Sequence, residues 1–217
     1  KPRQARRLRT KVPPKAKVHG AMIATALRRT GSAKAAPVYV SATTAASNTF
    51  TTPSGSVGDI IVIACRNANF VDTVPSGFTL LANGNDGYTW TTIGYRICDG
   101  TESGTYTWGG GAVSVCGAVR YSGATSVAIN TLKSTQSTTV SFNSITTPSG
   151  NNMLVEVVAY YPTPSAGQKG PSSGYTTRAD AATLTMAESV AATAGSYTPG
   201  TWTANDWTMT GVVALIP

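Results

Sequence analysis

Short apolar runs separated by turns rich in Gly, Pro and Ser recur along most of the chain. Some runs alternate apolar and polar residues with the period of two that is typical of a β-strand, and others are continuously apolar. The longest, 60–65 and 212–216, are far shorter than the roughly 20 residues of a membrane-spanning helix. The pattern predicts strands at 59–66, 88–98, 112–121, 153–161, 182–191 and 207–216, with further strand between 126 and 145.

The same landmarks occur twice, at an offset near 95 residues. The sequence TTPSG stands at Thr51–Gly55 and again at Thr146–Gly150, and in both halves an apolar strand and then a Gly turn before an aromatic residue follow. Two small sandwiches in tandem or one larger sandwich would explain such a repeat. We favour one sandwich, because a half of about 90 residues could barely cover its own apolar face.

The predicted fold class is therefore all-β: an antiparallel, jelly-roll-like β-sandwich of two pseudo-repeated halves, about 37–132 and 136–217. Its two sheets are expected to pack together, with their outer faces exposed to water. Composition favours the same class, because only 12% of residues are charged and the chain holds 22 Gly and 12 Pro. Many short strands joined by tight turns have this composition, and a helical bundle does not.

Charge divides the chain into two parts. Residues 1–36 hold eleven of the 17 Lys and Arg and no carboxylate, whereas the remainder has a net charge of about −3. We interpret 1–36 as an extended basic arm that becomes ordered against a partner, ahead of a sandwich at 37–217. The arm has neither the apolar stretch of a secretory signal nor enough apolar residues for a membrane anchor, so no membrane partner is expected. The residues expected to dock the arm are Arg3, Arg6, Arg7, Arg9, Lys11, Lys15, Lys17, Arg28, Arg29 and Lys34.

Candidate catalytic groups are few. The only histidine, His19, lies in the arm and has no carboxylate or cysteine near it in sequence. Asp99 and Glu102 could be a glycosidase pair, but three residues apart in a Gly-rich turn they are expected to cap the turn and stay solvated. Residues 83–87 fit a hairpin turn better than a calcium loop. We expect no enzyme activity, no metal and no cofactor. Buried free thiols are expected at Cys65, Cys98 and Cys116.

The aromatic residues have two interpretations. Trp and Tyr side chains could form a platform that stacks against sugar rings, or they could fill the core. The repeat favours the core for Trp108 and Trp202, which occupy equivalent places in the two halves. Tyr160 and Tyr161, at a strand end before Pro162, are the better candidates for exposed contact with a partner.

Five segments carry a resemblance to a known family. They are 53–62 (PSGSVGDIIV), 75–79 (PSGFT), 95–108 (YRICDGTESGTYTW), 118–123 (AVRYSG) and 207–217 (WTMTGVVALIP). Together they resemble a β-sandwich family of tailed bacteriophages, over about residues 38–217. The resemblance implies a virion structural role, as a minor tail or capsid decoration component, and contact with other virion proteins. The chain departs from the family in having Phe78 and Tyr175 where Trp is common, and the basic arm lies outside the resemblance.

Three hypotheses account for the arm. It could fix the sandwich to acidic surfaces of neighbouring virion proteins, with the protein a homo-oligomer in the assembled particle. It could instead bind the packaged nucleic acid, as in a jelly-roll coat protein, and its affinity would then fall steeply with salt. In the third, the protein is a carbohydrate-binding adhesion module that contacts host-surface glycans. We favour the first, because apolar and rigid residues such as Pro13 and Pro14 are interspersed among the charges.

Overall fold

The computed structural model describes residues 34–67, 73–102, 104–109, 113–164, 170–171, 173–204 and 207–217, without the side chains of residues 113 and 114. Within these ranges the chain is all-β, as predicted, and the strands pair antiparallel. No helix in the described part of the chain is long and apolar enough to cross a membrane. The described residues all belong to one compact unit.

The first large sheet comes from the first half of the sandwich. Its strand order is β1-β7-β3-β5-β4. The bounds are β1 (Val38–Ala45), β3 (Ile60–Asn67), β4 (Thr79–Asn85), β5 (Trp90–Ile97) and β7 (Val113–Ser122).

The second large sheet repeats that arrangement. Its order is β8-β17-β12-β14-β13, and β9 also pairs with β17. The bounds are β8 (Ser126–Ile129), β9 (Lys133–Gln136), β12 (Asn152–Tyr161), β13 (Thr176–Ala181), β14 (Leu184–Ala191) and β17 (Trp207–Ile216). Strands that correspond in the repeat, such as β3 with β12 and β7 with β17, hold the same places in the two sheets. The division between the sheets lies before Ser126, earlier than the predicted boundary near 132, because β8 pairs with β17.

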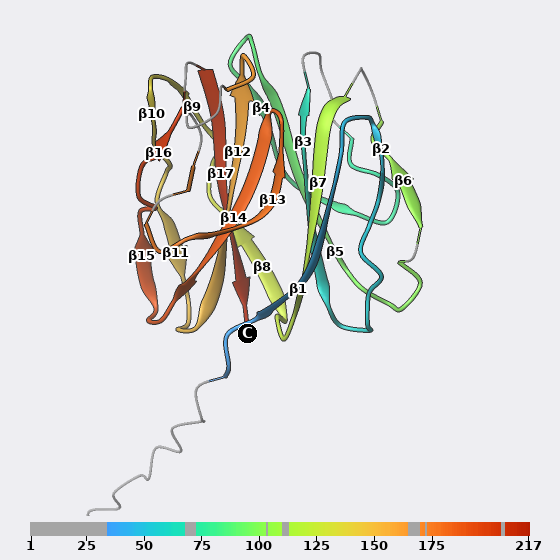
Figure 1. Ribbon diagram of the computed structural model, residues 1–217. Coiled ribbons are helices and arrows are strands. Elements are labelled where there is room, and N and C mark those ends of the chain that lie inside the picture. The colour runs from blue at the N-terminus through green and yellow to red at the C-terminus, as the bar shows by residue number, and fades with distance from the viewer. Residues whose placement is uncertain are drawn as a thin grey trace, which may run out of the picture. The chain divides into compact units, whose positions relative to one another are not determined.

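Short strand pairs cover the outer face of each large sheet (Figure 1). The pair β2 (Thr49–Thr51) and β6 (Thr105–Thr107) lies outside the first sheet. The pairs β11 (Ile145–Thr147) with β15 (Gly195–Tyr197) and β10 (Thr139–Val140) with β16 (Trp202–Thr203) lie outside the second. The expectation of water-exposed outer faces is therefore wrong: the molecule has four layers.

Three apolar clusters fill the spaces between these layers. The central cluster joins the two large sheets through residues such as Val62 and Val157. An outer cluster under β2 and β6 contains Trp108, and the corresponding one in the second half contains Trp202. Both indoles are 1% exposed, which confirms the predicted core positions. Because both faces of β3 are covered, its whole length is buried, and its first six residues, Ile60–Cys65, are accordingly continuously apolar rather than alternating.

The β4–β5 connection is a hairpin, as the Asn-Gly and Asp-Gly pairs predict. Asp86 Oδ1 accepts hydrogen bonds from the backbone N–H groups of Tyr88 at 2.8 Å and Thr89 at 2.6 Å. Gly87 has φ +91°, a conformation that L-residues rarely adopt. The Asp86 side chain therefore stabilises the turn, and this turn places Tyr88 at the end of the sandwich.

Candidate functional site

Lys34 marks the point where the basic arm joins the sandwich. Its Nζ donates a hydrogen bond to the Pro217 carbonyl oxygen at 3.0 Å, and its own carbonyl accepts one from Asn151 Nδ2 at 2.9 Å. This lysine is the one predicted docking residue that the structure describes. The other nine lie outside the described residues: Arg3, Arg6, Arg7, Arg9, Lys11, Lys15, Lys17, Arg28 and Arg29.

A group of stacked aromatic rings lies at the end of the sandwich away from Lys34, where β12 ends and β17 begins. Tyr161 and Trp207 are opposite each other in register, and Tyr88 reaches them from the hairpin of the other sheet. The Tyr88 centroid lies 4.6 Å from that of Trp207 and 5.8 Å from that of Tyr161, with interplanar angles of 27° and 24°. The Arg66 guanidinium carbon is 5.4 Å from the Tyr161 centroid. We call these three rings the aromatic end.

Only one of the two tyrosines predicted for surface contact is exposed. Tyr161 is 40% exposed, but Tyr160 is fully buried, so its assignment as a contact residue is wrong. Neighbouring residues of a strand point to opposite faces, and Tyr160 points into the outer cluster that contains Trp202. The sequence pattern predicts that this face is exposed, whereas the short strand pairs cover it.

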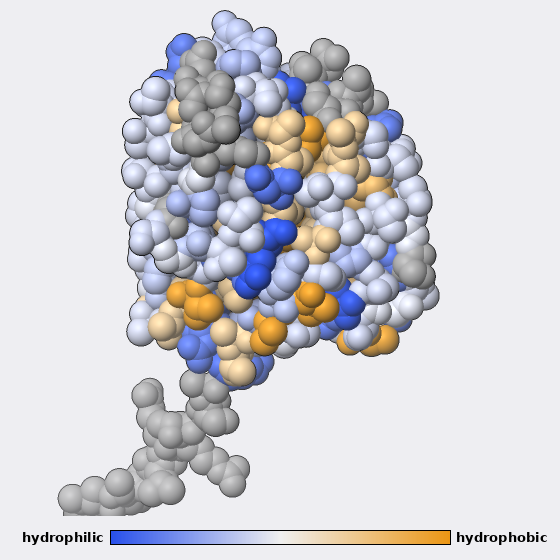
Figure 2. All heavy atoms as spheres, viewed as in Figure 1, coloured by the Kyte–Doolittle hydropathy of each residue, from blue (hydrophilic) through white to orange (hydrophobic). Residues whose placement is uncertain are grey.

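Exposed aliphatic side chains gather at the other end of the sandwich, around Lys34. We call this the arm-junction end and define it by Val38, Val57, Ile97 and Val190, which are 60%, 78%, 51% and 52% exposed. Figure 2 shows hydrophobic residues along this lower end, where the described chain begins and ends. The ten residues of β12 separate it from the aromatic end by about 30 Å, at about 3.3 Å per residue.

Charged residues at the arm-junction end are paired with one another. Arg120 Nε donates to Asp59 Oδ2 at 2.6 Å, while Arg96 lies 3.1 Å from Asp99 Oδ2 and 3.2 Å from Glu102 Oε1. Glu102 accepts hydrogen bonds from the backbone N–H groups of Asp99 and Gly100, so it does cap the turn as predicted. It is fully buried, however, and the expectation that it stays solvated is wrong. Hydrogen bonds from Thr101 lower the pKa of Asp99 to about 2.

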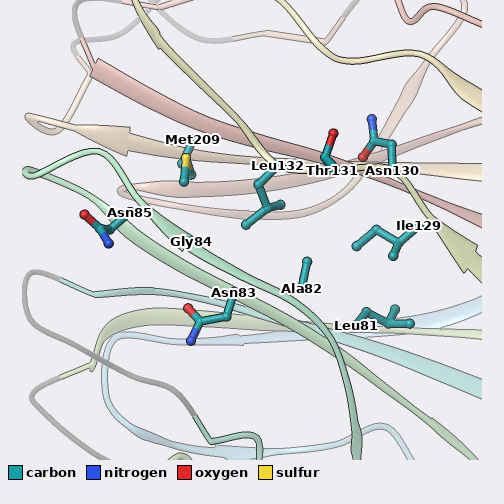
Figure 3. Close-up of a pocket in the computed structure, with 10 residues that line it drawn as sticks. All are labelled: Leu81, Ala82, Asn83, Gly84, Asn85, Ile129, Asn130, Thr131, Leu132 and Met209. Carbon is teal, nitrogen blue, oxygen red and sulfur yellow. The ribbon is translucent and has the colours of Figure 1, made fainter.

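A groove of about 490 Å³ runs between the free edges of the two sheets, along β4 on one side and the segment joining β8 to β9 on the other. Figure 3 shows Ala82 and Leu132 extending from opposite walls into the space between them. Asn130 is occupied in structural hydrogen bonds, because its Oδ1 accepts from Val212 N at 2.8 Å and its Nδ2 donates to Asn143 O at 2.6 Å. The ten described residues that line the groove include no titratable side chain, so they offer no acid, base or metal-binding carboxylate.

The most perturbed carboxyl group of the second half is buried beneath the outer layer. Glu156 is fully buried and accepts a hydrogen bond from the Trp202 indole N–H. Burial raises the pKa of Glu156 to about 8, despite the opposing effect of hydrogen bonds from Tyr175 and Trp202. Because Trp202 covers it, the Glu156 carboxyl group has no access to a substrate. Its protonation state affects the stability of the fold.

The three cysteines are free and buried, as predicted. Burial raises the pKa of Cys65 to about 12 and that of Cys98 and Cys116 to about 11, so the thiols stay protonated and are poor nucleophiles at neutral pH. No group of three or more His, Cys, Asp or Glu residues is placed to hold a metal ion in the part of the chain that the structure describes.

The comparisons with known proteins add no relative. The sequence matches no protein-family model, and no curated protein or solved structure matches it at a significant level.

Two features of the site were not predicted from the sequence. The aliphatic residues of the arm-junction end lie far apart in the chain, and the ring stack joins Tyr88 and Trp207 across two sheets. Neither leaves a local pattern in the sequence.

Proposed function

We propose that this chain is a non-enzymatic structural protein of a virus particle, a minor tail or capsid decoration component that neighbouring virion proteins hold through the basic arm. The observation that carries the proposal is the polarity of the sandwich. Exposed aliphatic side chains lie at the end where the arm joins, and exposed aromatic ones lie about 30 Å away at the other. A module that is attached at one end and presents the other needs this arrangement.

Rigidity supports a structural role for the sandwich. Both large sheets are covered on both faces, and three apolar clusters hold the four layers together. The ion pairs Arg120–Asp59 and Arg178–Glu188, in which the carboxylates are buried, tie neighbouring strands, and the Arg178 Nε to Glu188 Oε1 distance is 2.7 Å. Acidic groups engaged in this way are not free for acid–base catalysis, which favours a scaffold over an enzyme.

A jelly-roll coat protein whose arm binds the packaged nucleic acid is the alternative. The concentration of cations in residues 1–36 favours it, since each neutralised phosphate releases a counterion. The sandwich itself contributes little to such binding, because Arg96, Arg120 and Arg178 are each paired with a carboxylate. Nucleic acid binding would therefore depend on the arm alone and would fall steeply between 50 and 200 mM salt.

The test uses virus particles purified from the source of this sequence. Antibody raised against the sandwich, with gold label and electron microscopy, should place the chain on the particle. A full-length variant with Gln at Arg3, Arg6, Arg7 and Arg9 should then show at least tenfold lower incorporation, measured by quantitative mass spectrometry. Incorporation equal to that of the unaltered chain would reject attachment through the arm. Absence of the chain from the particles would reject the virion role itself.

A further inference from the structure

The arm-junction end has the features of a contact surface that the fold itself does not require. Val57 is the most exposed large hydrophobic residue of the described chain, at 78%, and it lies in the turn before β3. Val38, Ile97 and Val190 are each more than half exposed. Covering an exposed aliphatic side chain with a partner removes apolar surface from water and so favours association. Four such residues at one end provide the centre of an interface.

Strand register places Val38, Ile97 and Val190 at the same end of the sandwich although they are far apart in sequence. Ile97 is opposite Ile60 at the start of β3, Ile60 is opposite Tyr121, and the next residue of β7 is opposite Val38. Val190 is opposite Met153 at the start of β12, beside the Asn151–Lys34 hydrogen bond. Residues of both sheets therefore lie at this end, together with Lys34, where the arm joins the sandwich.

The charge at this end is balanced within the sandwich. Arg96 and Arg120 are engaged by Asp59, Asp99 and Glu102, so the exposed surface here is apolar and close to neutral. Eleven of the 17 Lys and Arg residues belong to residues 1–36, and the described chain begins at this same end. A partner that meets both must present an apolar patch next to an acidic region.

We propose, on the basis of the proposed function, that Val38, Val57, Ile97 and Val190 form a docking face for another protein, and that this protein's apolar patch is bordered by acidic residues that bind the arm. Burial of the patch provides affinity, and the arm provides charge complementarity and a fast approach. The sandwich end and the arm thus contact one partner together, and the affinity of each part adds to that of the other.

A membrane and a nucleic acid fit this end less well. Proteins that lie on a bilayer place Trp and Tyr in the interface, but here the exposed aromatic residues Tyr88 and Tyr161 lie at the opposite end. A nucleic acid needs cations over its phosphates, whereas exposed Val and Ile add nothing to that contact. The arm alone could bind either, and so the test must probe the docking face itself.

Photo-crosslinking in assembled particles tests the docking face. A photoreactive phenylalanine analogue replaces Val57 in the full chain, and the control carries the same analogue in place of Tyr88, which is 50% exposed at the other end. We expect the analogue at position 57 to form a crosslink to a peptide of another particle protein that is rich in Asp or Glu. We expect at least tenfold less product from position 88.

Three results would overturn the proposal: equal crosslinking at the two positions, crosslinking of position 57 to nucleic acid or lipid only, or none at position 57 in particles that contain the chain. The last of these leaves the virion role intact, and absence of the chain from particles rejects both ideas. A second variant pair, Val57→Lys and Tyr88→Lys, gives an independent readout. Val57→Lys should lower incorporation at least tenfold and leave the melting temperature unchanged, whereas Tyr88→Lys should not lower incorporation.

Discussion

The two halves of the sandwich place a tryptophan in the same position but surround it differently. Trp202 donates its indole N–H to the buried carboxyl group of Glu156, and its ring lies 5.8 Å from that of Phe142. Trp108 lies 6.1 Å from the ring of Phe50 and next to the Cys116 thiol, and no carboxylate of the described chain accepts a hydrogen bond from its indole N–H. Shape is retained between the repeated halves, while the polar chemistry under the tryptophan differs.

The strands beneath the two tryptophans carry this difference. The outer-facing positions of β3 are Ile61, Ile63 and Cys65, all apolar and buried. In β12, Glu156 stands between Leu154 and Val158 on the corresponding face. A buried carboxyl group is tolerated where an indole N–H satisfies it, and only at a pH where it can stay protonated. The stability contribution of Glu156 should therefore fall as the pH rises above about 5, whereas Asp99 of the first half has a lowered pKa and its contribution changes only at more acidic pH.

Truncation of the tryptophans should have the largest effect on stability. Trp108→Ala and Trp202→Ala should each lower the free energy of unfolding by about 3–5 kcal/mol, because each leaves a large cavity. The milder Trp202→Phe should cost about 1 kcal/mol more than Trp108→Phe, since it also removes the donor to Glu156. Urea unfolding followed by circular dichroism measures all four. Equal costs for the two Phe variants would mean that the hydrogen bond contributes nothing net.

The pH dependence of stability comes next in size. The pKa of Glu156 is raised from 4.5 to about 8 in the folded protein, so the folded state holds a proton that the unfolded state has lost. Its contribution to stability is complete below about pH 4.5, and it falls by about 1.4 kcal/mol per pH unit until the folded pKa is passed. Glu156→Gln should remove this slope.

The control for this prediction is a second-half residue with no carboxyl group. Tyr175→Phe keeps Glu156 in place but removes a hydrogen bond that lowers its pKa, so the slope should remain and extend to higher pH. Urea unfolding at a series of pH values from 5 to 9 gives the difference between the unaltered chain and each variant. If the difference in free energy of unfolding between the unaltered chain and Glu156→Gln does not change with pH, the Glu156 carboxyl group has an ordinary pKa.

The smallest expected effect concerns a matching irregularity in the two edge strands. A bulge interrupts β4 at Leu81 and β13 at Arg178. Arg178 pairs with Glu188 and lies 4.1 Å from the Tyr39 ring, so Arg178→Met should cost about 1–3 kcal/mol by leaving the buried Glu188 without its partner. Leu81→Met changes only packing and should cost less than about 1 kcal/mol. Thermal unfolding of both variants at pH 7 tests the contrast, which fails if Leu81→Met costs as much as Arg178→Met.

The fold class could be predicted from the sequence because its signals are local. The turn residues of 83–87 and the apolar run of β3 need only their own neighbours for interpretation, and the repeated TTPSG motif disclosed the two halves directly. The alternation of Tyr160 and Tyr161 was visible too, but the choice of which face is exposed was not. That choice depends on the short strand pairs, whose two- and three-residue strands have almost no sequence signature.

The sequence by itself determined the all-β class, the internal repeat, the buried thiols and the separation of a basic arm from a mildly acidic body. Each of these follows from residue type and spacing. Only the tertiary structure decided that the outer faces are covered, that Glu102 and Glu156 are buried, and that exposed aliphatic and aromatic residues occupy opposite ends. These features arise from contacts between residues up to 183 positions apart, as between Lys34 and Pro217, and residue spacing does not encode such contacts.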